Sequence, residues 1–147
     1  HALGGRVGPN PRGREIGTIT VGLSDAAASD PLFAGLPERI QVQATHLESV
    51  LELPVDTVLL ASSQLDPHHA FRVPGRPVWG VQFHPEFSAA VTRGYIEAKR
   101  RDMATEGLEP DRLLAGIRET RWGGDILARF AQRADEVAVA RPTGARE

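Results

Sequence analysis

A run of five strand-like segments in the first 83 residues limits the fold of this chain more than any other feature. Each segment is rich in β-branched or aromatic residues and is bounded by turn-forming residues, which is the pattern of short β-strands. The segments are 15–23, 39–45, 57–62, 69–73 and 78–83. Longer helical patterns follow them. Strands in succession followed by helices are typical of an α/β domain with a mixed central β-sheet flanked by helices.

Three helices are predicted after the last strand, and each has a start signal. Ser88 precedes a helix over 89–104, Pro110 suits the first turn of the second helix, and Asp125 precedes the third. A short helix or turn is also predicted over 31–34, with Asp30 as its N-cap. We expect residues 1–136 to form one domain and residues 137–147, which lack an amphipathic pattern, to form a disordered tail.

The composition excludes several classes of function. The 147 residues carry a formal net charge of −2, so the chain has no basic footprint for nucleic acid and no polybasic patch for a membrane surface. No apolar run approaches the roughly 18 residues of a membrane-spanning helix. We therefore expect a cytoplasmic protein without a membrane or nucleic-acid partner. The chain has no cysteine, and so it has neither a disulfide nor a thiol nucleophile of its own.

The stretch GVQFHPEF, residues 80–87, places an imidazole and a carboxylate on either side of a proline. If the chain stays extended here, His84 and Glu86 lie on one face, because alternate side chains of a strand share a face. Pro85 restricts the conformation of His84 and keeps this geometry rigid. A carboxylate beside an imidazole fixes its tautomer and stabilises the imidazolium, as in the base of a nucleophilic triad. A surface turn that ends a strand is the alternative interpretation.

Three further motifs accompany this pair. HALGG (1–5) is typical of a helix end closed by glycine, EIG opens the strand at 15–23, and ATHLESV (44–50) ends the next strand. Together with GVQFHPEF they resemble the class I glutamine amidotransferases, and in particular amidotransferase domains similar to that of GMP synthase. The resemblance runs from His1 to about Glu97. It implies a flavodoxin-like α/β fold.

The resemblance also implies roles for particular residues. His84 matches the catalytic histidine of the family, and Glu86 matches its catalytic glutamate. Thr45, Leu47 and Glu48 match a turn that binds the substrate, mostly through main-chain groups. The implied reaction is hydrolysis of the glutamine side-chain amide through a Cys-His-Glu triad and a thioester, without a cofactor. The ammonia would pass to an accepting synthase domain or subunit.

The chain departs from the family at the nucleophile. The family's cysteine lies on a tight turn ahead of the helix that matches HALGG, and these residues contain no cysteine. We therefore expect an N-terminally truncated chain, the C-terminal portion of the domain, that is inactive by itself. Two alternatives are a γ-glutamyl peptide or amine hydrolase with the same triad, and an inactive amidotransferase-like module that binds a partner.

The other histidines are predicted to have structural roles. His46 is expected to shape the wall of the pocket rather than to act in the chemistry. His68 and His69 could be imagined to form a metal cluster with Asp66, His46 and Glu86. However, adjacent side chains of an extended chain point to opposite faces, so His68 and His69 could not easily share one ion. No metal site is therefore predicted.

Two arginines and two tryptophans complete the interpretation. Arg12 and Arg14 flank a glycine in a turn-rich segment and are expected to be solvated. Trp79 lies at a strand position and is predicted to belong to the core. Trp122 lies beside two glycines and is predicted to anchor the last helix to the body of the domain.

Overall fold

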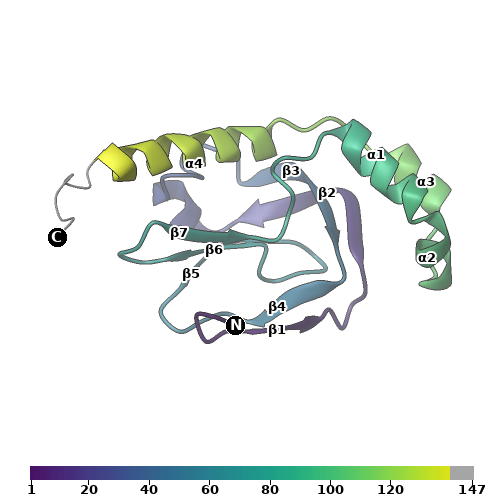
Figure 1. Ribbon diagram of the computed structural model, residues 1–147, viewed down its shortest axis with the longest axis horizontal. Helices are drawn as coiled ribbons and strands as arrows, with labels where there is room; N and C mark the ends of the chain where they lie inside the picture. Colours follow the sequence, from purple (N-terminus) through teal and green to yellow (C-terminus); the bar gives the residue numbers. More distant parts are fainter. Residues whose placement is uncertain (140–147) are drawn as a thin grey trace, which may run out of the picture.

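The computed structural model describes residues 1–139 and shows a curled sheet with helices beside it (Figure 1). The strands are β1 Arg6–Pro9, β2 Glu15–Leu23, β3 Arg39–His46, β4 Glu48–Glu52, β5 Val58–Ser62, β6 Ala70–Val73 and β7 Val78–Val81. The helices are α1 Ala89–Ala98, α2 Arg100–Thr105, α3 Pro110–Gly116 and α4 Trp122–Val139. A short 3-10 helix, η1, spans Asp25–Ser29.

Five strands form the main sheet in the order β3-β2-β5-β6-β7, and β1 pairs with β4 in a separate small sheet. Leu47 alone separates β3 from β4, so the chain passes from the main sheet to the small one within a single residue. The α/β class with helices beside a sheet is as predicted. The strand pairings within residues 1–139 are all antiparallel, so the parallel pairs of a mixed sheet are not among them.

The helices lie in two groups (Figure 1). Helices α1, α2 and α3 pack against one another at one end of the main sheet, where α1 and α3 contact β2. Helix α4 runs over the sheet and contacts β3. Within the described part of the chain, no helix combines the length and the apolar character needed to span a bilayer.

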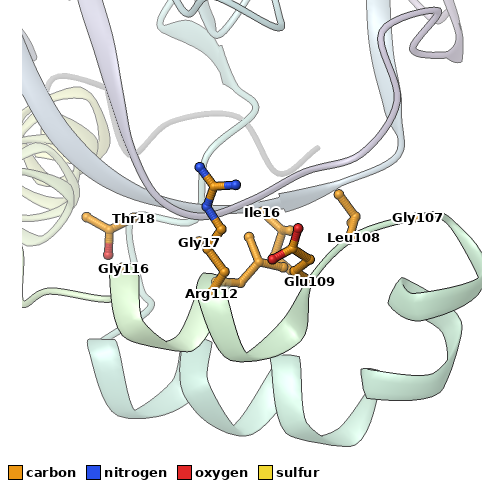
Figure 2. A pocket seen from close by; sticks show the side chains of 9 residues that line it. Ile16, Gly17, Thr18, Gly107, Leu108, Glu109, Arg112 and Gly116 are labelled. Atoms are coloured by element: carbon orange, nitrogen blue, oxygen red, sulfur yellow. The ribbon is translucent and has the colours of Figure 1, made fainter.

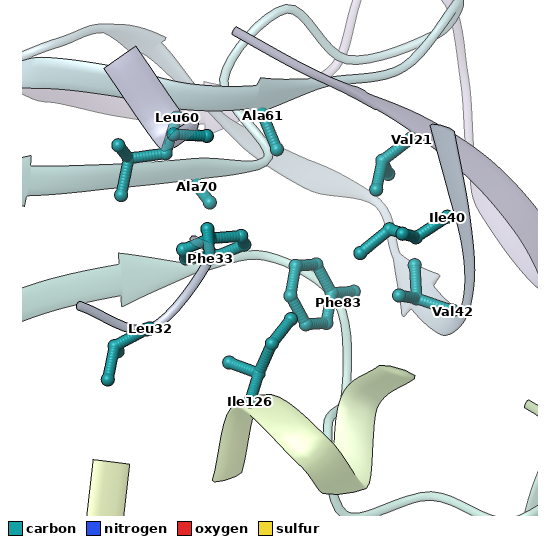
Figure 3. Packing of buried hydrophobic residues seen from close by; sticks show 11 residues of the cluster. Val21, Leu32, Phe33, Ile40, Val42, Leu60, Ala61, Ala70, Phe83 and Ile126 are labelled. Carbon is teal, nitrogen blue, oxygen red and sulfur yellow. The ribbon is translucent and has the colours of Figure 1, made fainter. Parts of the chain in front are cut away.

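The main hydrophobic core lies between the sheet, the segment around η1 and helix α4 (Figure 3). Phe83, just after β7, lies between the side chains of β2 and β3 and Ile126 of α4. Trp79 and Trp122 pack against this core, as predicted. The buried members are Val21, Ala27, Leu32, Phe33, Ile40, Val42, Leu60, Ala61, Ala70, Phe83 and Ile126.

A second, smaller core lies under helices α1 to α3. It contains Ile16, Ala89, Ile96, Met103 and Ile117. Strand β2 therefore buries side chains on both faces, with Ile16 in the small core and Val21 in the main core. Alternation along a strand cannot indicate this, because the helices that cover the second face of β2 come from far along the chain.

The helix predicted over 89–104 is in fact two helices that meet at Lys99 (φ −105°, ψ 14°). Ser88 caps the first of them as predicted, because its hydroxyl accepts a hydrogen bond from the Val91 N–H at 3.3 Å. Val91 itself is exposed. The residues that α1 buries are Ala89, Thr92 and Ile96.

Helix α4 begins and ends elsewhere than predicted. It starts at Trp122, so Asp125 lies in its first turn and is not its cap. This first turn contains two glycines. Because glycine is a weak helix former, the sequence pattern did not indicate that the helix begins at Trp122. The helix continues to Val139, into the range 137–147 that was predicted as a tail. Residues 140–147 lie outside the described part of the chain.

The small sheet was missed by the sequence interpretation, because RVGP contains turn-forming residues and becomes a strand by pairing with β4, where Arg6 faces Glu52. Residues 31–34 form a turn, one of the two forms predicted for them. In that turn Asp30 is fully buried and its Oδ1 accepts a hydrogen bond from the Leu32 N–H at 2.9 Å, which is the capping type of contact that was expected of it.

Ile126→Ala should lower the free energy of unfolding by about 2–5 kcal/mol, because it leaves a cavity where α4 meets the main core. The neighbouring Leu127 is 42% exposed, so Leu127→Ala is the matched control and should cost less than about 1 kcal/mol. Denaturant unfolding of the two variants measures the difference. Equal losses would contradict the placement of this helix.

Candidate active site

His84 and Glu86 meet on a tight turn rather than on a strand. Strand β7 ends at Val81, and the Phe87 N–H donates to the His84 carbonyl oxygen at 3.2 Å, which closes a four-residue turn. Pro85 occupies the second position of that turn, for which its fixed φ is suited. The predicted extended geometry is therefore wrong. The predicted contact is nevertheless present, with His84 Nδ1 2.8 Å from Glu86 Oε1.

The electrostatics of this pair favour an ionised carboxylate. Burial by itself would raise the pKa of Glu86, but the hydrogen bond with His84 and one from its own backbone N–H lower that pKa below its usual range. The His84 ring also stacks on Phe87, with centroids 4.2 Å apart. Because Nδ1 is engaged by Glu86, Nε2 is the ring atom that can take up a proton. The side chains of His84 and Glu86 are 33% and 53% exposed, so the pair is open to a reactant.

Strand β3, the segment just before β6 and strand β4 hold the turn of residues 84–87, which we call the catalytic turn after its predicted role. The His84 N–H donates to the Gln43 carbonyl of β3 at 2.8 Å. The Gln82 N–H donates to the His69 carbonyl at 2.8 Å, and the Gln82 side-chain amide donates to the Glu48 carbonyl at 2.6 Å. The turn that carries the imidazole is therefore fixed by the backbone on both sides of it.

The predicted substrate-binding residues lie where β3 passes into β4. The Leu47 carbonyl accepts from the Asn10 N–H at 2.8 Å, and the Glu48 carbonyl accepts from Gln82. Both carbonyl groups are thus engaged within the protein, which fixes the orientation of this turn. Leu47 is exposed, whereas the hydroxyl oxygen of Thr45 is buried. The hydrogen bond between Gln82 and Glu48 ties this turn directly to the one that carries His84.

The sequence interpretation missed a buried carboxylate. Glu15, the first residue of β2, is 4% exposed and accepts hydrogen bonds from His69 Nε2 at 2.6 Å, His46 Nε2 at 3.2 Å and Ser63 Oγ at 2.6 Å. Burial would raise the pKa of Glu15, but these three hydrogen bonds outweigh it and lower the pKa to about 2. The sequence did hold a sign of this burial. Side chains alternate between the two faces of a strand, so Glu15 lies on the same face of β2 as the buried Val21.

Glu15, His46 and His69 each offer one possible metal-ligand atom, and these three atoms lie within 4.8 Å of one another. At this separation the three residues could be candidates for a metal site. Zinc binds such ligands at about 2.0–2.1 Å, so two of them on one ion lie well over 3 Å apart. The separation of 2.6 Å between His69 and Glu15 is that of a hydrogen bond. The cluster is therefore built as a hydrogen-bonded node, which we call the Glu15 node (Glu15, His46, Ser63 and His69).

Of the five residues considered for a metal cluster from the sequence, His46 and Asp66 lie near each other. His46 Nδ1 lies 3.9 Å from Asp66 Oδ2, next to the Glu15 node. His68 points the other way, as predicted for neighbouring residues, and its Nδ1 contacts the Val50 carbonyl. Glu86 pairs with His84 on the catalytic turn instead.

The arginines near the N-terminus are not simply solvated. Arg14 binds both carboxylate oxygens of Glu106 at 2.7 and 2.8 Å, and this pairing raises its pKa and lowers that of Glu106. Arg12 donates to the Gln64 carbonyl at 2.7 Å. The two contacts fix the segment between β1 and β2. Arg12 is exposed to solvent as predicted, whereas Arg14 is partly buried in its ion pair, which the prediction of a solvated side chain missed.

An open groove of about 390 Å³ lies between β2 and α3 (Figure 2). Gly17 and Thr18 line one side of it, and Glu109, Arg112 and Gly116 line the other. Neither His84 nor Glu86 contributes to its wall. The groove is therefore separate from the candidate active site.

The sequence of the chain matches that of a known family. The sequence model of the family described as "Glutamine amidotransferase class-I" matches residues 1–100, which include both His84 and Glu86. The chain belongs to this family.

Curated relatives are named as GMP synthases. The glutamine-hydrolysing GMP synthase of Thermosipho africanus is 37% identical over 86 residues, which are 58% of this chain and 16% of that protein. A relative from Thermococcus kodakarensis, named as one subunit of a glutamine-hydrolysing GMP synthase, is 36% identical over 84 residues, 57% of this chain and 43% of that protein. The chain therefore spans less than half the length of these relatives.

Solved structures share the fold. A glutamine amidotransferase from Thermotoga maritima is similar with a TM-score of 0.69 and 25% identity, over 89% of this chain and 55% of that one. A glutamine amidotransferase from Methylobacillus flagellatus has a TM-score of 0.71 at 19% identity, over 89% of this chain and 57% of that one. The curled sheet flanked by helices is thus the fold of class I amidotransferases.

Glu15→Gln should lower the free energy of unfolding near neutral pH by about 3 kcal/mol, the equivalent of the lowered pKa. In the folded protein the pKa of Glu15 falls from 4.5 to about 2, so its contribution is complete above pH 4.5 and is lost as the pH falls toward 2. The difference between wild type and variant should therefore stay constant at neutral pH and shrink between about pH 5 and about pH 2. Denaturant unfolding at several pH values measures it.

Glu38→Gln is the control for this experiment, because Glu38 is an exposed glutamate just before β3. It should change stability little at either end of the pH range. A loss in Glu15→Gln that stays constant from neutral to acidic pH would contradict the lowered pKa of Glu15.

Proposed function

We propose that the protein containing this chain hydrolyses the side-chain amide of glutamine, with His84 as the base and Glu86 as the residue that orients it. The contact of 2.8 Å between His84 Nδ1 and Glu86 Oε1 carries the proposal, because it leaves Nε2 for proton transfer. Membership of the class I family and the similarity to GMP synthases support the choice of glutamine.

The nucleophile is proposed to be a cysteine supplied from outside these residues, since the 147 residues contain none. Nε2 of His84 takes the thiol proton as sulfur bonds to the amide carbon. The proton passes to the amide nitrogen, which leaves as ammonia, and a γ-glutamyl thioester remains. Water then adds to the thioester carbon and gives its proton to Nε2. Glutamate leaves as that proton returns to sulfur.

The turn formed by Thr45, Leu47 and Glu48 is proposed to bind the amino-acid end of glutamine. It is tied to the catalytic turn through Gln82, so both parts of the site hold a fixed separation. The ammonia is proposed to pass to a synthase domain or to a separate synthase subunit. Transfer between subunits is supported by the relative from Thermococcus kodakarensis, which is named as one subunit of GMP synthase.

The test is a glutaminase assay of the complete protein that contains residues 1–147, with glutamine and a γ-glutamyl dipeptide compared as substrates. We expect turnover of glutamine and much slower turnover of the dipeptide. Residues 1–147 alone are the background control and should release no glutamate, because they lack a thiol nucleophile. Preference for the dipeptide would instead indicate a γ-glutamyl hydrolase, and inactivity of the complete protein would indicate a binding module.

His84→Ala should nearly abolish turnover in the complete protein, and Glu86→Gln should reduce kcat/KM by clearly less than about 10⁴, the loss seen when serine triads lose their carboxylate. A thiol ionises far more readily than a hydroxyl, so it depends less on the carboxylate. The kcat/KM profile of Glu86→Gln should also move toward lower pH, because the imidazolium loses a stabilising charge.

Glu52→Gln is the control for these variants, because it breaks only an exposed ion pair with Arg6. It should leave both the rate and the pH profile unchanged. The same rate and profile in Glu86→Gln as in wild type would mean that Glu86 merely ends the turn.

A further inference from the structure

The first turn of α4 touches the catalytic turn at a position where only glycine fits. A Cβ atom placed on Gly123 would lie 2.9 Å from the Cα and 3.0 Å from the carbonyl oxygen of Pro85. Carbon atoms in ordinary contact lie about 3.5–4.0 Å apart, so the backbone would have to move. The next residue, Gly124, has open space around its Cβ position. The close approach is therefore specific to one of two adjacent glycines.

Helix α4 is held on the body of the domain and cannot easily withdraw from this contact. Ile126 lies one turn beyond Gly123 and is 3% exposed in the main core beside Phe83 (Figure 3). Trp122 packs against the same core. Arg129 donates to the Leu32 and Ala34 carbonyls at 3.0 and 2.8 Å. The helix thus has anchors on both sides of its contact with Pro85.

The hydrogen bonds that tie the catalytic turn to neighbouring segments lie at Gln82 and His84, so Pro85 and Glu86 after them can yield more easily than the helix. The catalytic turn lies after the end of β7, and His84 and Glu86 are partly exposed. Pro85 stands between these two residues, so a displacement of its backbone changes the position of both. Any side chain larger than hydrogen at position 123 would therefore press on the turn that holds the imidazole.

We propose that Gly123 is a positioning residue for the reaction, which lets α4 support the His84–Glu86 turn from behind at backbone contact. This inference rests on the proposed function. Position 123 lies beyond residues 1–100 that match the family, so the support comes from a part of the chain outside that match. Gly123 is not proposed to touch the substrate. Its effect on His84 and Glu86 is proposed to pass through its contact with Pro85.

The first test is the kinetics of Gly123→Ala and Gly124→Ala in the complete protein. Both changes place alanine in the first turn of α4, so both raise helix propensity equally. Gly123→Ala should lower kcat on the order of ten- to hundredfold, the effect of a misplacement near 1 Å. Its KM for glutamine should change by less than about threefold, since no substrate contact is lost. Gly124→Ala should behave as wild type.

The second test is the ¹⁵N signal of the His84 ring by NMR, which does not depend on turnover. The Nδ1 signal reports the hydrogen bond with Glu86, and it should shift in Gly123→Ala and stay in place in Gly124→Ala. Equal kinetics and equal signals for the two variants would overturn the inference, as would global unfolding of Gly123→Ala. If wild type shows no glutaminase activity, the proposed function fails, while the ring signal still decides whether Gly123 positions His84.

Discussion

The carboxylate of Glu15 is the interaction on which the rest of the site depends. A buried carboxylate is tolerated only when its lone pairs are satisfied, because desolvating a charge costs several kcal/mol. Here the donors come from the end of β3, from the segment after β5 and from the start of β6. A single charge thus fixes how three parts of the chain meet at one end of β2.

The Glu15 node lies next to the two turns that form the candidate site. His46 Nδ1 lies 3.1 Å from the Glu48 carbonyl, which also accepts the hydrogen bond from Gln82. Gln82 is two residues before His84 in the chain. The buried carboxylate, the substrate turn and the catalytic turn therefore belong to one continuous set of hydrogen bonds. Networks of this kind favour a single geometry, although His69 Nδ1 is buried without a hydrogen-bond partner among the described residues.

The parts that the sequence could predict are those that short segments determine. The contact between His84 and Glu86 needed only a proline between two polar residues, and it formed although the backbone turned instead of staying extended. The cap at Ser88 was predictable for the same reason. Glu15 was not, because its partners lie 31, 48 and 54 residues away along the chain. Pairing over such separations follows from the tertiary fold, which single-sequence patterns do not contain.

The exposure of His84 is consistent with its proposed role as a base that is held in position before a nucleophile reaches it. Catalytic groups are effective when the protein holds them in position in advance, because no reorganisation is then needed during the reaction. Every restraint on this imidazole described above lies within residues 1–139: Glu86 at Nδ1, Phe87 on its face, and Gln43 at its backbone. These restraints hold the imidazole in place without any residue outside this range. A segment bearing the proposed thiol would then have to bring its sulfur to Nε2 of His84.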